Sequence, residues 1–198
     1  MEITIDEEVV RTAYANADDK TKALLEKLLG SSVVIPSSSV TDRVKTFANA
    51  CDELGENHPL VKAYTTASFN TGGSPDDVSD VIAHLKLRIV VAALNEGWKP
   101  KFVKDERRWM PWFVLYTNDE IEQMNENDKA NICLFAGQSL GEDYEYGGMA
   151  LADVNSSTSR SLTNDGSLLS FKSSELAKYA GLQFVELYRD FMLSNMEV

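Results

Sequence analysis

Apolar side chains recur at helical spacing through much of the chain. The clearest case is the segment 74–96, in which apolar residues line one face: Val78, Ile82, Leu85, Ile89 and Ala93. Ser74 is the expected N-cap, and Pro75 suits the first helical position. From Leu85 onward this segment is apolar almost all round, which predicts a helix at the centre of the fold.

Shorter stretches with the same periodicity predict further helices. They cover residues 8–29 with a break near 16–19, 40–54, 58–69, 119–128 and 173–194. Capping residues favour the same boundaries. The expected N-caps are Thr4, Thr41, Thr117, and Ser173 or Ser174. The N-terminal half is therefore predicted to be helical, and a further helix is predicted to close the chain.

Strand signals are confined to the second half. Residues 112–116 and 132–136 are rich in aromatic and β-branched side chains. The glycine- and serine-rich region 137–166 predicts a β-meander with long loops, ending in a hairpin turn at 164–166 that joins 159–162 to 167–171. Strands and helices do not alternate, so the predicted fold class is α+β with a small antiparallel sheet.

The serine-rich stretch 31–39, SSVVIPSSS, separates the first helical pair from the rest. We therefore expect a helical appendage over 1–30, a Ser/Pro connector over 31–39 and a main α+β domain over 40–198.

Composition narrows the possible partners. The chain has 31 acidic and 19 basic residues, a net charge of −12, which disfavours binding to duplex DNA over the whole surface and to anionic membranes. The longest apolar-rich stretch, 85–94, contains Lys86 and Arg88 and is too short to span a bilayer. Without a secretory signal pattern, we expect a soluble, cytoplasmic protein with reduced thiols at Cys51 and Cys133.

No common catalytic motif is present. The sequence lacks a P-loop, GxGxxG, GxSxG and HExxH, so we expect no cofactor, no metal and no enzymatic activity. A hydrolase that uses Asp143, Glu145 or Asp153 beside the glycine-rich loops stays open as an alternative. Asp80 and His84 lie one helical turn apart, but they are interpreted as a solvated polar face.

The most distinctive stretch is the aromatic–basic segment 98–116. Its part 98–108 has a local charge of +3. Aromatic rings interleaved with cations are typical of single-stranded nucleic-acid binding. The residues that would carry it are Trp98, Lys99, Lys101, Phe102, Arg107, Arg108 and Trp109. In the other interpretation the aromatics form core and the cations neutralise the acidic helix at 119–128.

Three stretches in order resemble a family of uncharacterised proteins encoded by phages and prophages of Bacteroidetes bacteria. They are TDRVKTFANACDELG, LKLRIVVAALNEGWKP with RRWMPWFVLYT, and SFKSSELAKYAGLQFVELYRDFM. The resemblance implies a phage-encoded protein in a bacterial cytoplasm or in a virion. The sequence and the resemblance together lead us to expect a non-enzymatic accessory protein that binds phage or host proteins. An acidic inhibitor of a host DNA-binding protein is a further alternative.

Overall fold

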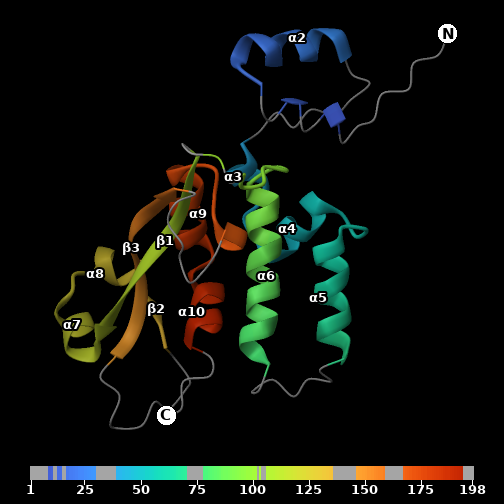
Figure 1. Ribbon diagram of the computed structural model, residues 1–198. Coiled ribbons are helices and arrows are strands. Elements are labelled where there is room, and N and C mark those ends of the chain that lie inside the picture. Colours follow the sequence, from blue (N-terminus) through green and yellow to red (C-terminus); the bar gives the residue numbers. More distant parts are fainter. Residues whose placement is uncertain are drawn as a thin grey trace.

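The computed structural model describes residues 9–10, 13–14, 17–29, 39–70, 78–101, 103, 106–135, 146–158 and 167–193. Helices dominate the first half of this part of the chain, a three-stranded antiparallel sheet follows, and two helices close it (Figure 1). The predicted α+β class is confirmed. The helices are α2 (Asp19–Leu29), α3 (Val40–Arg43), α4 (Phe47–Leu54), α5 (Pro59–Asn70), α6 (Ser79–Leu94), α7 (Asn118–Gln123), α8 (Glu126–Lys129), α9 (Ser174–Gln183) and α10 (Val185–Leu193).

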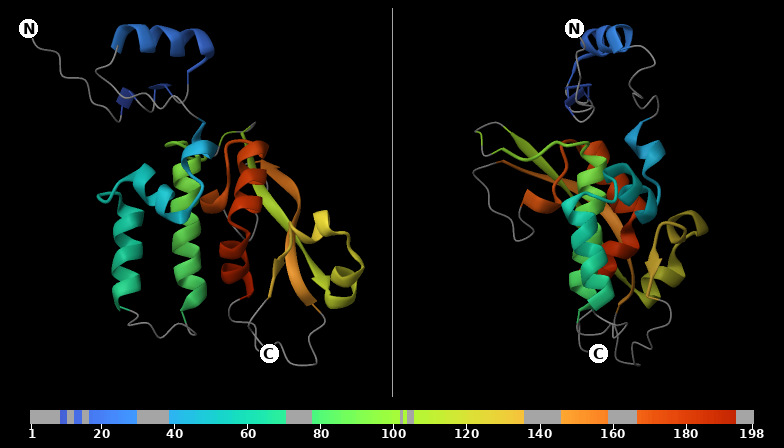
Figure 2. Two further views of the ribbon diagram at one scale, coloured as in Figure 1. Left: turned by 180° about the vertical axis from the view of Figure 1, so that it is seen from behind. Right: turned by 90° about the vertical axis from the view of Figure 1, so that its right-hand side faces the viewer.

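The main body is layered. The sheet forms one side, α9 and α10 cover one of its faces, α6 packs behind them, and α4 and α5 lie on the far side of α6 (Figures 1 and 2). Leu87, Ile89, Val90 and Leu94 of α6 are completely buried. Burial of each such side chain contributes about 1.5–3 kcal/mol to the stability of the fold. Because α6 is buried between α10 on one side and α4 and α5 on the other, it is the central helix, as its sequence predicts.

The N-terminal helix α2 lies apart from the layered body in all three views (Figures 1 and 2). Ala17 and Asp18 precede it as a non-helical pair, at the predicted break. Leu24 and Leu28 on α2 are exposed. Residues 30–38 lie outside the described part of the chain, so the division at 31–39 stays a prediction.

Two of the predicted helices are each divided in the structure. Residues 40–54 form α3 and α4, because the hydroxyl of Thr46 accepts from the N–H of Asn49 and starts a second helix. Ser39, not Thr41, caps α3. The closing helix begins after Ser173, as predicted, but Phe184 separates α9 from α10.

The acidic helix after β1 is also divided, into α7 and α8. The predicted capping box of Thr117 and Glu120 is present at the start of α7. Asn125 accepts two further N–H groups and begins α8. Because Asn125 starts a new helix at this point, α7 ends at Gln123, before the predicted end of the acidic helix.

The sheet has the order β1-β3-β2, so β3 lies in the middle. The strands are β1 (Arg107–Thr117), β2 (Cys133–Leu134) and β3 (Tyr146–Thr158). β1 pairs antiparallel with β3 from Arg107 opposite Thr158 to Thr117 opposite Tyr146, with irregularities after Trp112 and after Tyr116. A side chain at Gly181 of α9 would collide with Leu151 and Pro111, so α9 packs closely on both strands.

The strand predictions were partly wrong. β1 starts at Arg107 instead of residue 112, because Pro111 is accommodated on an edge strand, where no ladder N–H is needed. Within 137–166, the described residues form one long strand instead of a meander. Ser167–Leu169 is a 3-10 helix, η2, not a strand, and the hairpin turn at 164–166 lies outside the described residues.

Candidate functional site

The aromatic–basic segment 98–116 is divided between core and surface. Among the seven residues predicted for nucleic-acid binding, the exposed ones are Lys99, Lys101 and Arg107. Trp98 is half-buried, Arg108 is only 5% exposed, and Trp109 packs against the hydrophobic core. Phe102 lies outside the described residues. Among the described members of this set, the exposed side chains are therefore cations, and both tryptophans are half-buried.

Main-chain hydrogen bonds also hold Trp109. Its N–H donates to the carbonyl of Phe171 at 3.1 Å, and its carbonyl accepts the N–H of Phe171 at 2.8 Å. Trp109 is half-buried and packs against the hydrophobic core. Its contacts therefore agree with the interpretation in which this ring belongs to the packing between helix and sheet.

The exposed aromatic side chain of β1 is Trp112, at 60%. The sequence prediction did not include it among the binding residues. Side chains alternate between the two faces of a strand. Trp109 and Phe113 pack against the core, so Trp112 projects from the opposite face. The alternation within 109–113 could have identified it, once one of the aromatics was known to be buried.

The free edge of β1 can be followed by the direction of its main-chain N–H groups. At one end Trp109 bonds to Phe171, on the side away from β3. At the other end the N–H of Thr117 donates to Glu120 Oε2 at 2.9 Å. Main-chain groups alternate in direction along a strand, so Phe113 and Leu115 also point away from β3.

No partner meets the main chain of Phe113 or Leu115 on that side anywhere in the described part of the chain. Pro111 lies two residues before Phe113 and therefore points to the same side, but proline has no N–H. We call residues 111–117 the β1 edge. It offers two N–H donors with adjacent carbonyl acceptors, bordered by the exposed ring of Trp112. Such a row can pair with another extended chain.

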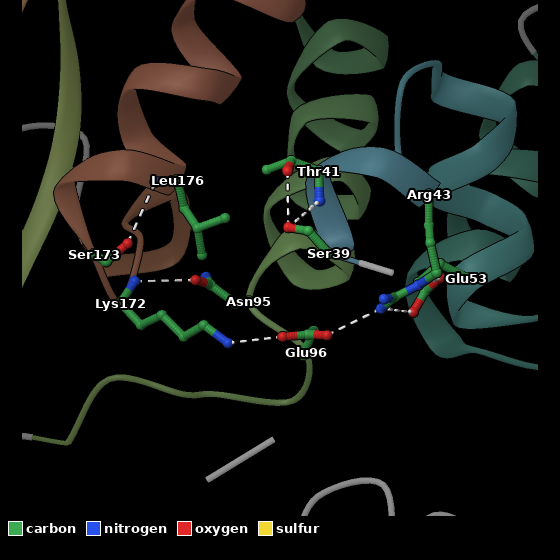
Figure 3. Close-up of polar contacts among 9 residues, drawn as sticks. All are labelled: Ser39, Thr41, Arg43, Glu53, Asn95, Glu96, Lys172, Ser173 and Leu176. Atoms are coloured by element: carbon green, nitrogen blue, oxygen red, sulfur yellow. Dashed lines mark hydrogen bonds and ion pairs between the residues drawn. The ribbon is translucent and has the colours of Figure 1, made fainter. Parts of the chain in front are cut away.

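A second cluster, the α6 junction, lies where α6 ends (Figure 3). We define it as Arg43, Glu53, Asn95, Glu96 and Lys172. Asn95 is 3% exposed, and its amide donates to the Ser170 carbonyl at 2.9 Å and accepts from the Lys172 N–H at 3.0 Å. It therefore links α6 to the segment before α9.

The Glu96 carboxylate joins two cations within the α6 junction. It meets Arg43 Nη2 at 2.9 Å and Lys172 Nζ at 3.0 Å, and Arg43 also binds Glu53 at 2.8 Å. Burial opposes ionisation of Glu96, but the hydrogen bonds from Arg43 and Lys172 outweigh it and lower the pKa of this carboxyl. Every charge in the cluster has a partner, which makes the junction a structural joint.

Glu96 also has an unusual backbone conformation, with φ of 48°. This left-handed region is costly for a residue with a side chain. Gly97 follows with φ of 83° and ends the turn. The ion pairs to α3 and to the segment before α9 hold Glu96 in this conformation.

Of the other groups considered for chemistry, the structure describes Asp80, His84 and Asp153. Asp153 is exposed, and its carboxylate accepts the adjacent N–H of Val154. Asp143 and Glu145 lie outside the described residues. Burial, aided by Arg88, lowers the pKa of His84, whose ring lies 5.2 Å from that of Phe191.

The free thiol of Cys133 lies 3.6 Å from Arg189. Burial raises the pKa of this thiol despite the neighbouring guanidinium, so the environment does not favour a thiolate. Within the described ranges no three His, Cys, Asp or Glu side chains come together as metal ligands.

Comparisons with models of protein families, with curated proteins and with solved structures gave no match. None of the helices in the described ranges has the length and apolar character needed to cross a membrane.

Proposed function

We propose that this chain is a non-enzymatic interaction protein, a phage accessory protein in the sense that its sequence resemblance implies, which binds another polypeptide along the β1 edge. One observation carries the proposal: within the described ranges, the main chain of Phe113 and Leu115 is unpaired on the side away from β3, beside an exposed tryptophan. An extended segment that joins such an edge gains main-chain hydrogen bonds, and side-chain contacts supply specificity.

The main chain of β1 is engaged on both sides of Phe113 and Leu115. Phe171 pairs with Trp109, just before the β1 edge, and Glu120 of the capping box accepts the N–H of Thr117 at its end. Natural proteins usually cover or charge an open edge, because it invites pairing with other chains. An added strand could form up to four hydrogen bonds here, each contributing about 0.5–1.5 kcal/mol, and could cover part of Trp112.

The proposal is tested by site-specific photocrosslinking in the cells that make the protein. Trp112 is replaced by the photoreactive residue p-benzoylphenylalanine, and Phe69, 86% exposed on α5, receives the same replacement as the matched control. We expect a covalent adduct with one defined polypeptide from position 112 and none from position 69. The adduct should disappear when Val114→Lys is added.

Mass spectrometry then identifies the bound polypeptide, including a second copy of the chain itself. Absence of any adduct at position 112, or equal adducts from both positions, would overturn the proposal. An adduct that persists with Val114→Lys would also overturn it, since binding would then not depend on the β1 edge.

A further inference from the structure

We infer that the polypeptide bound at the β1 edge is a second copy of this chain, which pairs antiparallel with the first about a two-fold axis at Val114. This inference rests on the proposed function and names its partner. It follows from the order of available donors and acceptors along residues 111–117, which reads the same from both ends.

The main-chain groups match in this register. With Val114 opposite Val114, Phe113 of one copy lies opposite Leu115 of the other. Both residues point their N–H and carbonyl groups outward, so the two symmetric pairs form four hydrogen bonds. Pro111 then lies opposite Thr117. Proline has no N–H, and the N–H of Thr117 already donates to Glu120, so pairing ends with no donor left unused.

The side chains match as well. Trp112 of one copy lies opposite Tyr116 of the other, on the face away from α9 and α10, and the same contact repeats across the axis. These are pairs without main-chain hydrogen bonds, in which opposite side chains come closest. Aromatic pairs at such positions stabilise a sheet. The exposed Trp112 ring thereby gains a partner that a single copy does not provide.

Charge favours the same antiparallel orientation. β1 begins with the exposed Arg107, and α7, directly after β1, begins with the exposed Asp119 and Glu120. Antiparallel pairing brings the basic start of β1 in one copy toward the acidic start of α7 in the other, whereas parallel pairing would bring like charges together. The second copy turns into α7 after Thr117, before it would reach the position opposite Trp109, which Phe171 occupies.

The association is measured by sedimentation velocity over a series of concentrations. The wild type should show a reversible monomer–dimer equilibrium. Val114→Lys places two like charges opposite each other at the axis and should weaken dimerisation roughly tenfold or more. Val81→Lys, at an exposed valine of α6, adds the same charge elsewhere and should leave dimerisation unchanged. Circular dichroism verifies that each variant folds.

Cysteine crosslinking tests the register. In the expected dimer the two Val114 Cα atoms lie about 4.5 Å apart, within the range that a disulfide spans. Val114→Cys should therefore give a disulfide-linked dimer on mild oxidation. Tyr116→Cys, on the same face, should not, because its two copies lie roughly 13 Å apart along the strand. The wild type, with Cys51 and Cys133, gives the background.

Amide hydrogen exchange of Phe113 and Leu115 separates the two ways of failing. A chain that stays monomeric at all concentrations, with fast exchange at both amides, would overturn the second copy as partner and leave the β1 edge open for another polypeptide. Slow exchange at both amides in dilute monomer would show that the edge is closed within one chain. That result would overturn both this inference and the proposed function.

Discussion

The α6 junction and the β1 edge differ in how their polar groups are used. At the junction Glu96 binds two cations, and the buried amide of Asn95 uses both its donor and its acceptor. At the edge the main chain of Phe113 and Leu115 has no partner on the side away from β3 among the residues that the structure describes. Satisfied polar groups hold a fold together, whereas an unsatisfied row can form new bonds with another molecule.

The comparison predicts that changes in the α6 junction lower stability and leave association unchanged. The largest effect is expected for Asn95→Leu, which removes the hydrogen bonds of Asn95 to the Ser170 carbonyl and to the Lys172 N–H. We expect a loss of about 3 kcal/mol in the free energy of unfolding, measured by urea denaturation. The exposed Asn57→Leu is the control. Equal stabilities for the two variants would show that the amide of Asn95 does not join these segments.

Glu96→Gln should have a smaller effect at neutral pH. It keeps the shape of the side chain but removes the charge that Arg43 and Lys172 share. Because the site is partly open to solvent, we expect a loss of about 1–2 kcal/mol. Glu122→Gln, at an exposed position of α7, should change stability by less than about 0.5 kcal/mol. A Glu96 variant as stable as this control would contradict the role of the ion pairs.

The same variant has a defined pH dependence. The folded protein lowers the pKa of Glu96 below its ordinary value of 4.5, so the stabilisation is fully present above that value and is lost as the pH falls through the folded pKa. The difference in unfolding free energy between wild type and Glu96→Gln should therefore be constant near neutrality and shrink in acid. A difference that grows in acid would show that folding raises the pKa of Glu96, which contradicts the prediction.

Trp112→Ser at the β1 edge should have the opposite profile. The ring of Trp112 is mostly exposed, so the free energy of unfolding of the dilute monomer, measured by thermal denaturation, should change by less than about 0.5 kcal/mol. Dimerisation, measured by sedimentation, should weaken. A large loss of monomer stability with unchanged association would place Trp112 among the residues that hold the fold together and remove it from the binding surface.

The smallest effect is expected for binding of the protein to single-stranded nucleic acid. Arg108 is buried and Trp109 is half-buried against the core, so we expect a labelled single-stranded oligonucleotide to show no rise in fluorescence anisotropy, even at low salt. Salt-sensitive binding that is lost on changing Lys99 and Lys101 to Glu would instead support nucleic-acid binding by the exposed cations.

Local patterns predicted much of the fold. The central helix, the helix at 58–69, the capping box of Thr117 and the cap at Ser173 all depend on neighbours within one or two turns. The divisions at Thr46 and Phe184 were not predicted, because helical periodicity continues across both. The predicted strand began at residue 112, just after Pro111, although an edge strand tolerates a proline.

The candidate site was less accessible from sequence. The composition of the segment 98–116 suggested that its aromatics and cations act together, but the alternation of side chains along β1 places Trp109 and Trp112 on opposite faces. Which of these faces is buried depends on where α9 packs. The open main chain of Phe113 and Leu115 leaves no trace in residue identity, since every residue except proline carries the same donor and acceptor.

The amino-acid sequence by itself determined the α+β class, the helical first half, the central apolar helix and the strongly negative charge, because each depends on composition or on short-range periodicity. Tertiary structure alone decided which main-chain groups of β1 are paired, which tryptophan is most exposed and which charges neutralise one another. Those properties depend on contacts between segments such as Trp109 and Phe171, or Arg43 and Glu96, that lie more than 50 residues apart in the chain.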